Sequence, residues 1–166
     1  MQLLELFNNV LPWEYSFEGE QEAFAQFTYN DVDYLVTFYS DYILGKFTDE
    51  EEIDPRLDAL ARELNYADAT SIEFTGTQKM DDVEGVPQHR TLGHKPSGTG
   101  GQFQVYATVI DIVRNYVQKN NIKCVTFSGK SGSQKTLYDR LGRMFVGWKQ
   151  LKVQEWDGTQ HFFYWR

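Results

Sequence analysis

Apolar residues recur every three or four positions in four stretches of the chain, which is the spacing of one buried helix face. Weaker patterns of this kind predict helices over residues 3–10, 55–64 and 133–144. The strongest pattern predicts a helix over 102–119, and its buried stripe is expected to be Tyr106, Val109, Ile110, Val113 and Val117. Helices are therefore expected in both halves of the chain.

Alternating apolar and polar residues predict strands between these helices. The alternation covers 23–29 and 33–40, and Asn30-Asp31 between the two runs is typical of a tight hairpin turn. Asp157-Gly158 indicates a second hairpin near the C-terminus. The further strands are expected at 70–77, 122–127, 146–155 and 159–165.

Residues 78–101 contain many Gly, Pro and His residues and have no apolar period. This composition predicts a long loop before the helix at 102–119, with one short strand near 90–92. The mixed order of helices and strands predicts a single α/β domain over residues 1–166, which is within the usual size of one domain.

Composition narrows the class of protein. With 41% hydrophobic residues, 12 Phe, 10 Tyr and 4 Trp, the chain has enough apolar surface to form a core, so disorder is not expected. Asp111 and Arg114 interrupt the longest apolar stretch, so no membrane span is predicted. The single Cys124 and a start without a basic leader favour a cytoplasmic location. The three histidines and Cys124 lack metal-ligand spacing, so no metal site is predicted.

Charge is unevenly distributed along the chain. Residues 1–84 hold 20 of the 24 acidic and 4 of the 16 basic residues, a net −16, whereas residues 85–166 have a net charge of +8. One interpretation is an acidic solvated surface with basic helix faces. The other is a protein that binds two ligands of opposite charge. The overall charge of −8 argues against broad binding to nucleic acid.

The segment Lys95-Pro96-Ser97-Gly98-Thr99-Gly100-Gly101 lies directly before the strongest predicted helix. Glycines at a helix start let backbone N–H groups approach phosphate oxygens, and the helix dipole favours an anion there. The segment matches neither the dinucleotide-binding fingerprint nor the P-loop pattern. It is either a phosphate-binding loop or an ordinary flexible loop with a glycine at the helix start.

Residues 95–100 resemble the R/Q-x-x-G-x-G/A loop of the GNAT superfamily of N-acetyltransferases, with Lys95 at the Arg/Gln position. Residues 136–142 are similar to that family's A-x-x-L-Y-x-x-L-G-F segment, although Arg143 stands where an aromatic residue is common. Residues 103–113 also resemble uncharacterised GNAT-like proteins of tailed bacteriophages. The resemblance implies a GNAT-like, mixed but mostly antiparallel central sheet that is flanked by helices and splayed around acetyl-CoA.

The same resemblance assigns roles to residues. Tyr138 would be the general acid that protonates the departing CoA thiolate, and its alternative role is packing beside Leu137 and Leu141. Glu73 is the best candidate for the general base, with His89 and His94 as alternatives. The residues expected to bind the pyrophosphate of acetyl-CoA are Lys95, Ser97, Gly98, Thr99, Gly100, Gly101, Gln102 and Lys135.

The implied function is acetyl-CoA-dependent acyl transfer to a cationic amine, either a small molecule or a protein lysine. The acidic cluster Asp49–Glu52 with Asp54 would attract such an amine or a basic protein partner. The alternative is a catalytically inactive GNAT-like binding or virion assembly protein, encoded by a phage and located in the host cytoplasm. The aromatic strand at Phe162–Trp165 is expected at the sheet edge, where it would support a homodimer.

Overall fold

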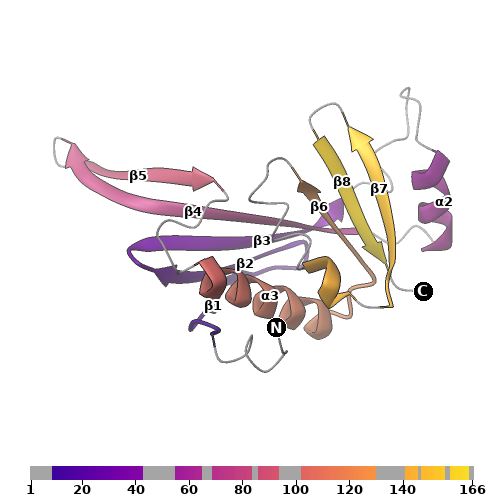
Figure 1. Ribbon diagram of the computed structural model, residues 1–166, viewed down its shortest axis with the longest axis horizontal. Coiled ribbons are helices and arrows are strands. Elements are labelled where there is room, and N and C mark those ends of the chain that lie inside the picture. The colour runs from indigo at the N-terminus through magenta and orange to yellow at the C-terminus, as the bar shows by residue number, and fades with distance from the viewer. Residues whose placement is uncertain are drawn as a thin grey trace.

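The computed structural model (Figure 1) describes residues 9–42, 55–64, 69–83, 86–93, 102–129, 141–145, 147–155 and 158–164. The N-terminal part contains β1 (Glu14–Glu18), β2 (Glu22–Tyr29), β3 (Val32–Tyr42) and α2 (Pro55–Glu63). It is followed by β4 (Ala69–Val83), β5 (Val86–Gly93), α3 (Gln102–Lys119), β6 (Cys124–Gly129), β7 (Lys149–Glu155) and β8 (Gly158–Tyr164). Residues 141–144 form a further helical turn. The predicted helix at 3–10 and most of that at 133–144 lie outside the described residues.

The described strands form one sheet in the order β1-β2-β3-β4-β6-β8-β7, and β5 pairs with β4 beside this path. Every pair is antiparallel except β4 and β6, which are parallel. The prediction of a mixed α/β domain with a mostly antiparallel sheet is therefore confirmed.

The β2–β3 hairpin follows the sequence pattern closely. Tyr29 pairs with Val32, and the two residues between them, Asn30 and Asp31, have φ angles of 48° and 59°. Asn and Asp tolerate this left-handed conformation better than other non-glycine residues, and two such residues match the twist of the strands that they join. The predicted turn is therefore confirmed.

One strand was not expected from the sequence, and two others are longer than predicted. Strand β1 lies at the sheet edge, where its residues are mostly exposed and give only a weak apolar alternation. The short strand predicted near 90–92 is confirmed as part of β5. Strands β4 and β5 form a long hairpin arm, so the predicted loop over 78–101 is wrong for 78–83 and 86–89 (Figure 1). Main-chain pairing with β4 defines β5, and a largely polar strand gives no hydrophobic period to detect.

The main core lies between α3 and one face of the sheet, which we call the inner face. Alternate residues of β3, from Val32 to Phe38, point to this face and are buried against α3. The buried surface of α3 is wider than the predicted stripe, because Ile112 and Tyr116 are buried whereas Ile110 and Val117 are only partly buried. Because successive side chains of a strand point to opposite faces, the residues between the buried ones point to the other face of the sheet, here called the outer face.

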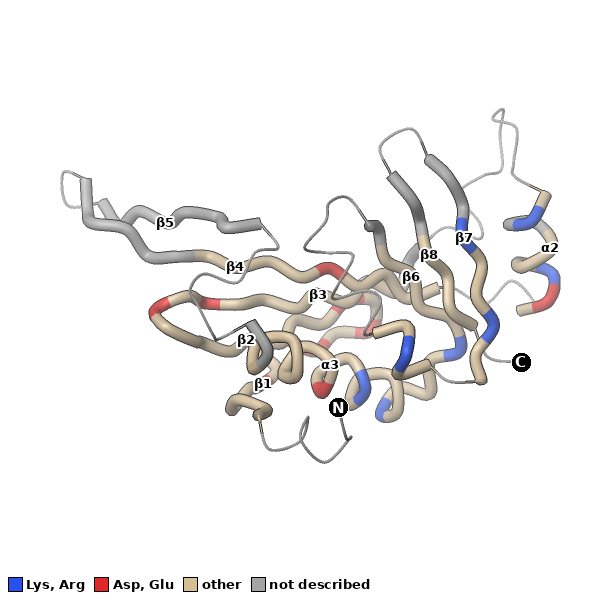
Figure 2. The backbone as a smooth tube through the Cα atoms, in the orientation of Figure 1, with Lys and Arg blue, Asp and Glu red and all other residues tan. Residues whose placement is uncertain are grey.

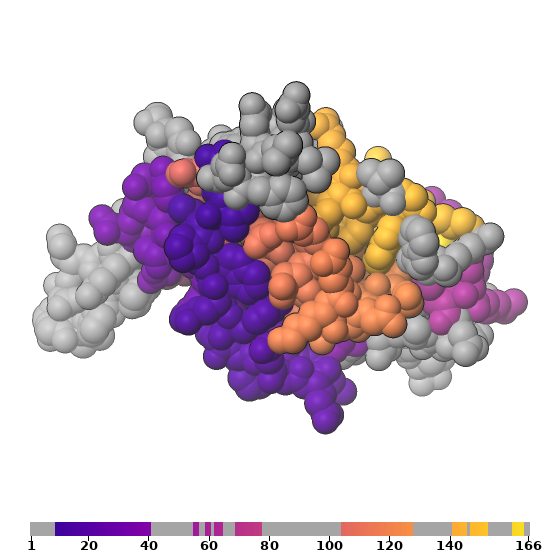
Figure 3. All heavy atoms as spheres, turned by 90° about the horizontal axis from the view of Figure 1, so that it is seen from below, coloured from indigo at the N-terminus to yellow at the C-terminus, as the bar shows by residue number. Residues whose placement is uncertain are grey.

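A polar seam joins β1 to α3. The Trp13 Nε1–H donates to Asp111 Oδ2 at 2.9 Å, and the Tyr15 hydroxyl donates to Asn115 Oδ1 at 2.7 Å. Lys119 forms an ion pair with Glu18 from the same strand. Figure 3 shows the N-terminal strands lying directly against α3 on this side of the molecule. The seam attaches the sheet edge to the helix that follows the glycine-rich segment.

Helix α2 covers a different part of the sheet. Leu60 packs with Ala69, Cys124 and Phe162 in a second, smaller core on the outer face. Burial there raises the pKa of the Cys124 thiol to about 12, which keeps the thiol protonated at neutral pH. Within the described ranges, no helix has both the length and the apolar character needed to cross a membrane.

The position of the aromatic C-terminal strand corrects one prediction. Strand β8 is paired with β6 on one side and with β7 on the other, so it is an inner strand and β7 is at the edge. Phe162 and Phe163 are 2% and 6% exposed. Their rings therefore stabilise the core and are not available to a partner, and a homodimer through this strand would have to use other groups.

Candidate functional site

The sheet has an open position between β4 and β6. These strands pair only through Thr70 with Val125 and Ser71 with Thr126. Strand β3 occupies the other edge of β4, and β5 joins β4 only from Gly76 onward. Residues 72–75 of β4 therefore have no described strand beside them on the β6 side. Figure 1 shows β6 turning away from β4 beyond the shared pairs.

Strand β6 diverges because its remaining contacts are with β8. From Phe127 to Gly129 it pairs with His161 to Thr159 of β8. The Phe127 ring stacks on Phe163 with centroids 5.4 Å apart and on His161 at 5.7 Å, both on β8. These contacts keep β6 aligned with the C-terminal hairpin, so the main-chain edge of β4 beside it remains open.

The glycine-rich segment follows a strand that ends beside this open edge. Strand β5 ends at Gly93, which pairs with Gly76 of β4, and α3 begins at Gln102. The first turn of α3 contains no acidic residue, so no side-chain charge there offsets the positive end of the helix dipole. Residues 94–101 lie outside the described residues, and with them Lys95, Ser97, Gly98, Thr99, Gly100, Gly101 and His94.

Glu73 is placed in the middle of the open segment of β4. Its neighbours Ile72 and Phe74 are buried on the inner face, whereas Glu73 is exposed on the outer face. Its carboxylate is therefore accessible to a substrate that approaches from that side. Tyr138 and Lys135 lie outside the described residues, so their positions relative to Glu73 stay predictions. The backbone of His89 pairs with Lys79 in the hairpin arm.

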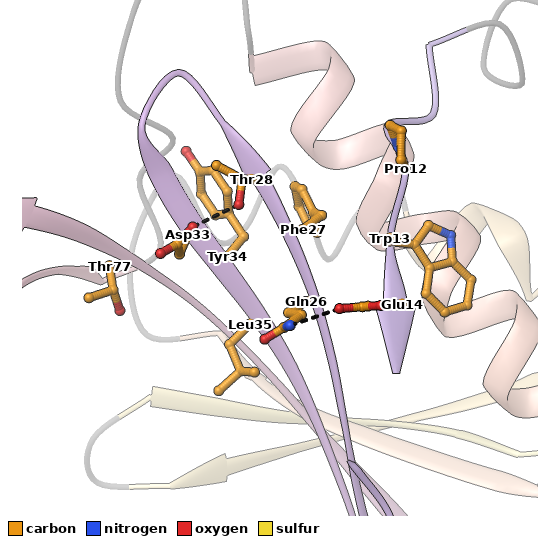
Figure 4. A pocket seen from close by; sticks show the side chains of 10 residues that line it. All are labelled: Pro12, Trp13, Glu14, Gln26, Phe27, Thr28, Asp33, Tyr34, Leu35 and Thr77. Atoms are coloured by element: carbon orange, nitrogen blue, oxygen red, sulfur yellow. Dashed lines mark hydrogen bonds between the residues drawn. The ribbon is translucent and has the colours of Figure 1, made fainter. Parts of the chain in front are cut away.

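A hollow of about 650 Å³, which the sequence did not reveal, lies along β1–β4 near the β2–β3 turn. In it, the Gln26 amide donates to Glu14 Oε1 at 3.2 Å, and the Thr28 hydroxyl donates to Asp33 Oδ1 at 2.7 Å (Figure 4). The hollow differs from the open edge of β4, because the β4 residue in its lining is Thr77, which lies beyond residues 72–75. Its lining residues are Pro12, Trp13, Glu14, Gln26, Phe27, Thr28, Asp33, Tyr34, Leu35 and Thr77.

The uneven charge of the sequence is also uneven in space. Acidic residues lie along β2, β3 and β4, whereas basic residues gather at the end of α3 and on β7 (Figure 2). Lys149 of β7 pairs with Glu63 of α2 at 3.2 Å, and Arg114 pairs with Asp111 within α3 at 2.9 Å. Among the residues that the structure describes, no three His, Cys, Asp or Glu side chains are grouped closely enough to hold a metal ion.

Comparison of the chain with models of known protein families, with characterised proteins and with solved structures found no significant match. The functional argument therefore depends on the topology, the placement of individual residues and the sequence motifs.

Proposed function

We propose that the protein is an acetyl-CoA-dependent N-acyltransferase of GNAT type, which transfers an acyl group to a cationic amine. One observation supports the proposal most: the glycine-rich segment follows β5, which ends where the open edge of β4 begins, and leads into the long helix α3. A mixed sheet that is splayed around the cofactor, with a glycine-rich loop before a long helix, is the arrangement that the resemblance implies.

The proposed cofactor site combines the helix start with the loop. Backbone N–H groups from Gly98 to Gln102 would donate to the pyrophosphate, and the dipole of the 18-residue helix α3 would favour its negative charge. Lys95 and Lys135 would add positive charge. The pantetheine arm would follow the edge of β4 at residues 72–75, on the side where no described strand lies.

The proposed chemistry assigns two proton transfers to two side chains. Glu73 would accept a proton from the acceptor ammonium, so that the amine nitrogen could attack the thioester carbon. As the carbon–sulfur bond breaks, the Tyr138 hydroxyl would donate its proton to the thiolate, and the second proton that leaves the amine nitrogen would restore the tyrosine hydroxyl. A phenol suits this role because its ordinary pKa of about 10 keeps it protonated at neutral pH.

Charge supports a cationic acceptor. The N-terminal strands, whose outer face carries Glu73, are acidic, and an acidic surface raises the local concentration of a protonated amine. We place the reaction in the cytoplasm, which would be the host cytoplasm for a phage protein. The acidic cluster at 49–54 lies outside the described residues, so its contribution stays a prediction.

Cofactor binding is tested by calorimetric titration with CoA of the parent and of the double variant Gly98→Val/Gly100→Val. Bulky side chains should block the approach of phosphate to the backbone and abolish binding, while circular dichroism shows an unchanged fold. CoA binding of unchanged affinity in the double variant would refute the site. A parent protein that does not bind CoA would refute the function.

Catalysis is tested with Glu73→Gln and with Glu20→Gln, a matched control in the β1–β2 turn. Acyl transfer to polylysine should fall about 10²–10⁴-fold in Glu73→Gln at unchanged CoA affinity, because a positioned proton acceptor is removed. Glu20→Gln should keep the parent rate. CoA binding without turnover in the parent would favour the alternative, an inactive GNAT-like binding or assembly protein.

A further inference from the structure

The outer face of β1–β4 is an exposed sheet surface with charge of one sign. Its rows follow from the strand register: Glu14 and Gln26 pair, Gln26 lies opposite Leu35, and Leu35 lies opposite Thr75. Glu14, Gln26, Asp33 and Glu73 are all exposed. Helix α2 covers the outer face only at the other end, where it packs on Ala69, Cys124 and Phe162. The face near the β2–β3 turn is therefore open to a partner.

The first three strands of this face carry no basic residue. Residues 1–45 contain no Lys, Arg or His, so β1, β2 and β3 contribute none. On β4 the first basic residue is Lys79, beyond the rows that face β2. Figure 2 shows the described basic residues mainly on α2, on β7 and towards the end of α3. The ion pair between Glu18 of β1 and Lys119 lies on the α3 side of the sheet, so it leaves Glu14 and Asp33 of the outer face to a cationic partner.

The hollow described above provides two oriented carboxylates on this face. Glu14 accepts one hydrogen bond from Gln26, and Asp33 accepts one from Thr28, each through a single oxygen atom (Figure 4). The second oxygen of each carboxylate, Oε2 or Oδ2, is not used in these bonds. A guanidinium or ammonium group can donate to such an oxygen, while Leu35 offers apolar surface for the methylene groups of its side chain.

The main chain beside the hollow is also open. Strand β1 begins at Glu14, opposite Gln26, so residues 27–29 of β2 have a described strand partner only on the β3 side. The preceding chain turns away to α3, where the Leu11 N–H donates to Thr108 Oγ1 at 2.9 Å. An unpaired strand edge accepts an extended polypeptide by main-chain hydrogen bonds. This feature favours a peptide over a small polycation.

We propose that the hollow and the acidic outer face around it form a docking site for an extended, Arg- or Lys-rich segment of another protein. The segment pairs with the free edge of β2 and places a basic side chain between Glu14 and Asp33. The docking site lies on the same face as Glu73 but does not include the glycine-rich segment, and it binds without CoA. It extends the proposed function only in that the acceptor lysine would belong to a basic protein.

Fluorescence polarisation with three labelled synthetic 12-residue peptides tests the site without any cofactor. One peptide is rich in Arg and Lys, the second has Gln at the basic positions, and the third has Glu there. The basic peptide should bind and the other two should not. Binding should weaken as sodium chloride is raised from 50 to 500 mM, because exposed charge pairs are screened. Unlabelled spermine serves as the competitor that represents a small polycation.

The double variant Glu14→Gln/Asp33→Asn should weaken binding of the basic peptide about tenfold, since each exposed charge pair contributes up to about 1 kcal/mol. Glu20→Gln/Glu63→Gln removes the same charge away from the hollow and should bind as the parent does. Thr77→Lys, which keeps both carboxylates and adds a positive charge to the hollow, should also weaken binding. Circular dichroism checks that each variant is folded.

The proposal is overturned if the parent does not bind the basic peptide, or if it binds the Gln peptide equally well. It is also overturned if the hollow variant and the control variant have the same dissociation constant, or if spermine competes as well as the unlabelled peptide does. None of these results bears on CoA binding, which is measured separately. Failure of the docking site and failure of the acyltransferase proposal are therefore distinguishable.

Discussion

Replacing Gly76 with alanine should destabilise the protein by about 1–2 kcal/mol. Gly76 is on the inner face of β4, at the point where β5 begins to pair with it. A Cβ atom there would lie 3.0 Å from Cε1 and 3.2 Å from Cδ1 of Tyr34, and 3.4 Å from Cγ1 of Val32. The first two distances are shorter than ordinary van der Waals contacts, so the ring of Tyr34 would have to move.

The ring has little room to move. Tyr34 is 1% exposed and stacks between Phe27, with centroids 5.1 Å apart, and Phe74, at 5.6 Å. Overpacking of a well-packed core costs about 1–3 kcal/mol. A Gly-to-Ala change returns about 0.4–1 kcal/mol by reducing the conformational freedom of the unfolded chain. The difference gives the expected net loss of about 1–2 kcal/mol.

Urea unfolding followed by circular dichroism measures this loss. With a slope of about 2 kcal/mol per molar, the midpoint of Gly76→Ala should fall by about 0.5–1 M. The Tyr34→Leu background removes the obstructing ring, so there the same substitution should cost much less. Thr77→Ala, next in the chain but on the outer face, should stay within about 0.5 kcal/mol. The reasoning fails if Gly76→Ala is as stable as the parent, or if its cost is equal in both backgrounds.

Three further predictions follow from single contacts. Cys124 is 1% exposed, and burial raises the pKa of its thiol to about 12. It should therefore react with a thiol reagent at pH 8 only after denaturant is added. Rapid labelling of the native protein would contradict this prediction. Burial, and secondarily the charge of Glu18, raises the pKa of Tyr15 to about 12. The unfolded chain therefore ionises this residue first as the pH rises from about 10. In urea titrations, the difference in stability between the parent and Tyr15→Phe should be constant below pH 10 and should shrink by about 1 kcal/mol towards pH 12. The change is small because the ring is partly exposed. Trp13→Phe removes the 2.9 Å hydrogen bond to Asp111, while Arg114 still pairs with that carboxylate. Thermal unfolding should therefore show that the free energy of unfolding falls by about 1 kcal/mol. An unchanged melting temperature would mean that the β1–α3 seam does not contribute to stability.

The elements that the sequence predicted well have a local signal. Helix α3 has the predicted bounds because eighteen residues carry one apolar period, and its end is marked by Asn121 in a left-handed conformation with φ of 51°. The β2–β3 hairpin is specified by alternation on both sides of Asn30-Asp31. In both cases the burial of one face explains the pattern.

The elements that the sequence missed are specified by pairing between distant segments. Strand β5 depends on a register with β4 that begins at Gly76 and Gly93, which no local period encodes. The same limit applies to β8: its aromatic residues indicated a buried or contacting strand, but only its pairing with both β6 and β7 places it inside the sheet. The open position between β4 and β6 likewise appears only when the order of strands is known.

The strand order also explains why charge segregation along the chain became segregation in space. Strands β1 to β4 are neighbours in the sheet, so the acidic residues that these strands carry lie together on one side. The chain then crosses along α3 to β6, and the basic second half continues into β8 and β7 at the opposite edge. The parallel pair β4–β6 is the boundary between the two parts, and β5, which precedes the glycine-rich segment, ends beside it. Because few residues pair across this boundary, the acidic strands β1 to β4 present a face of their own, which is where a cationic partner would be attracted.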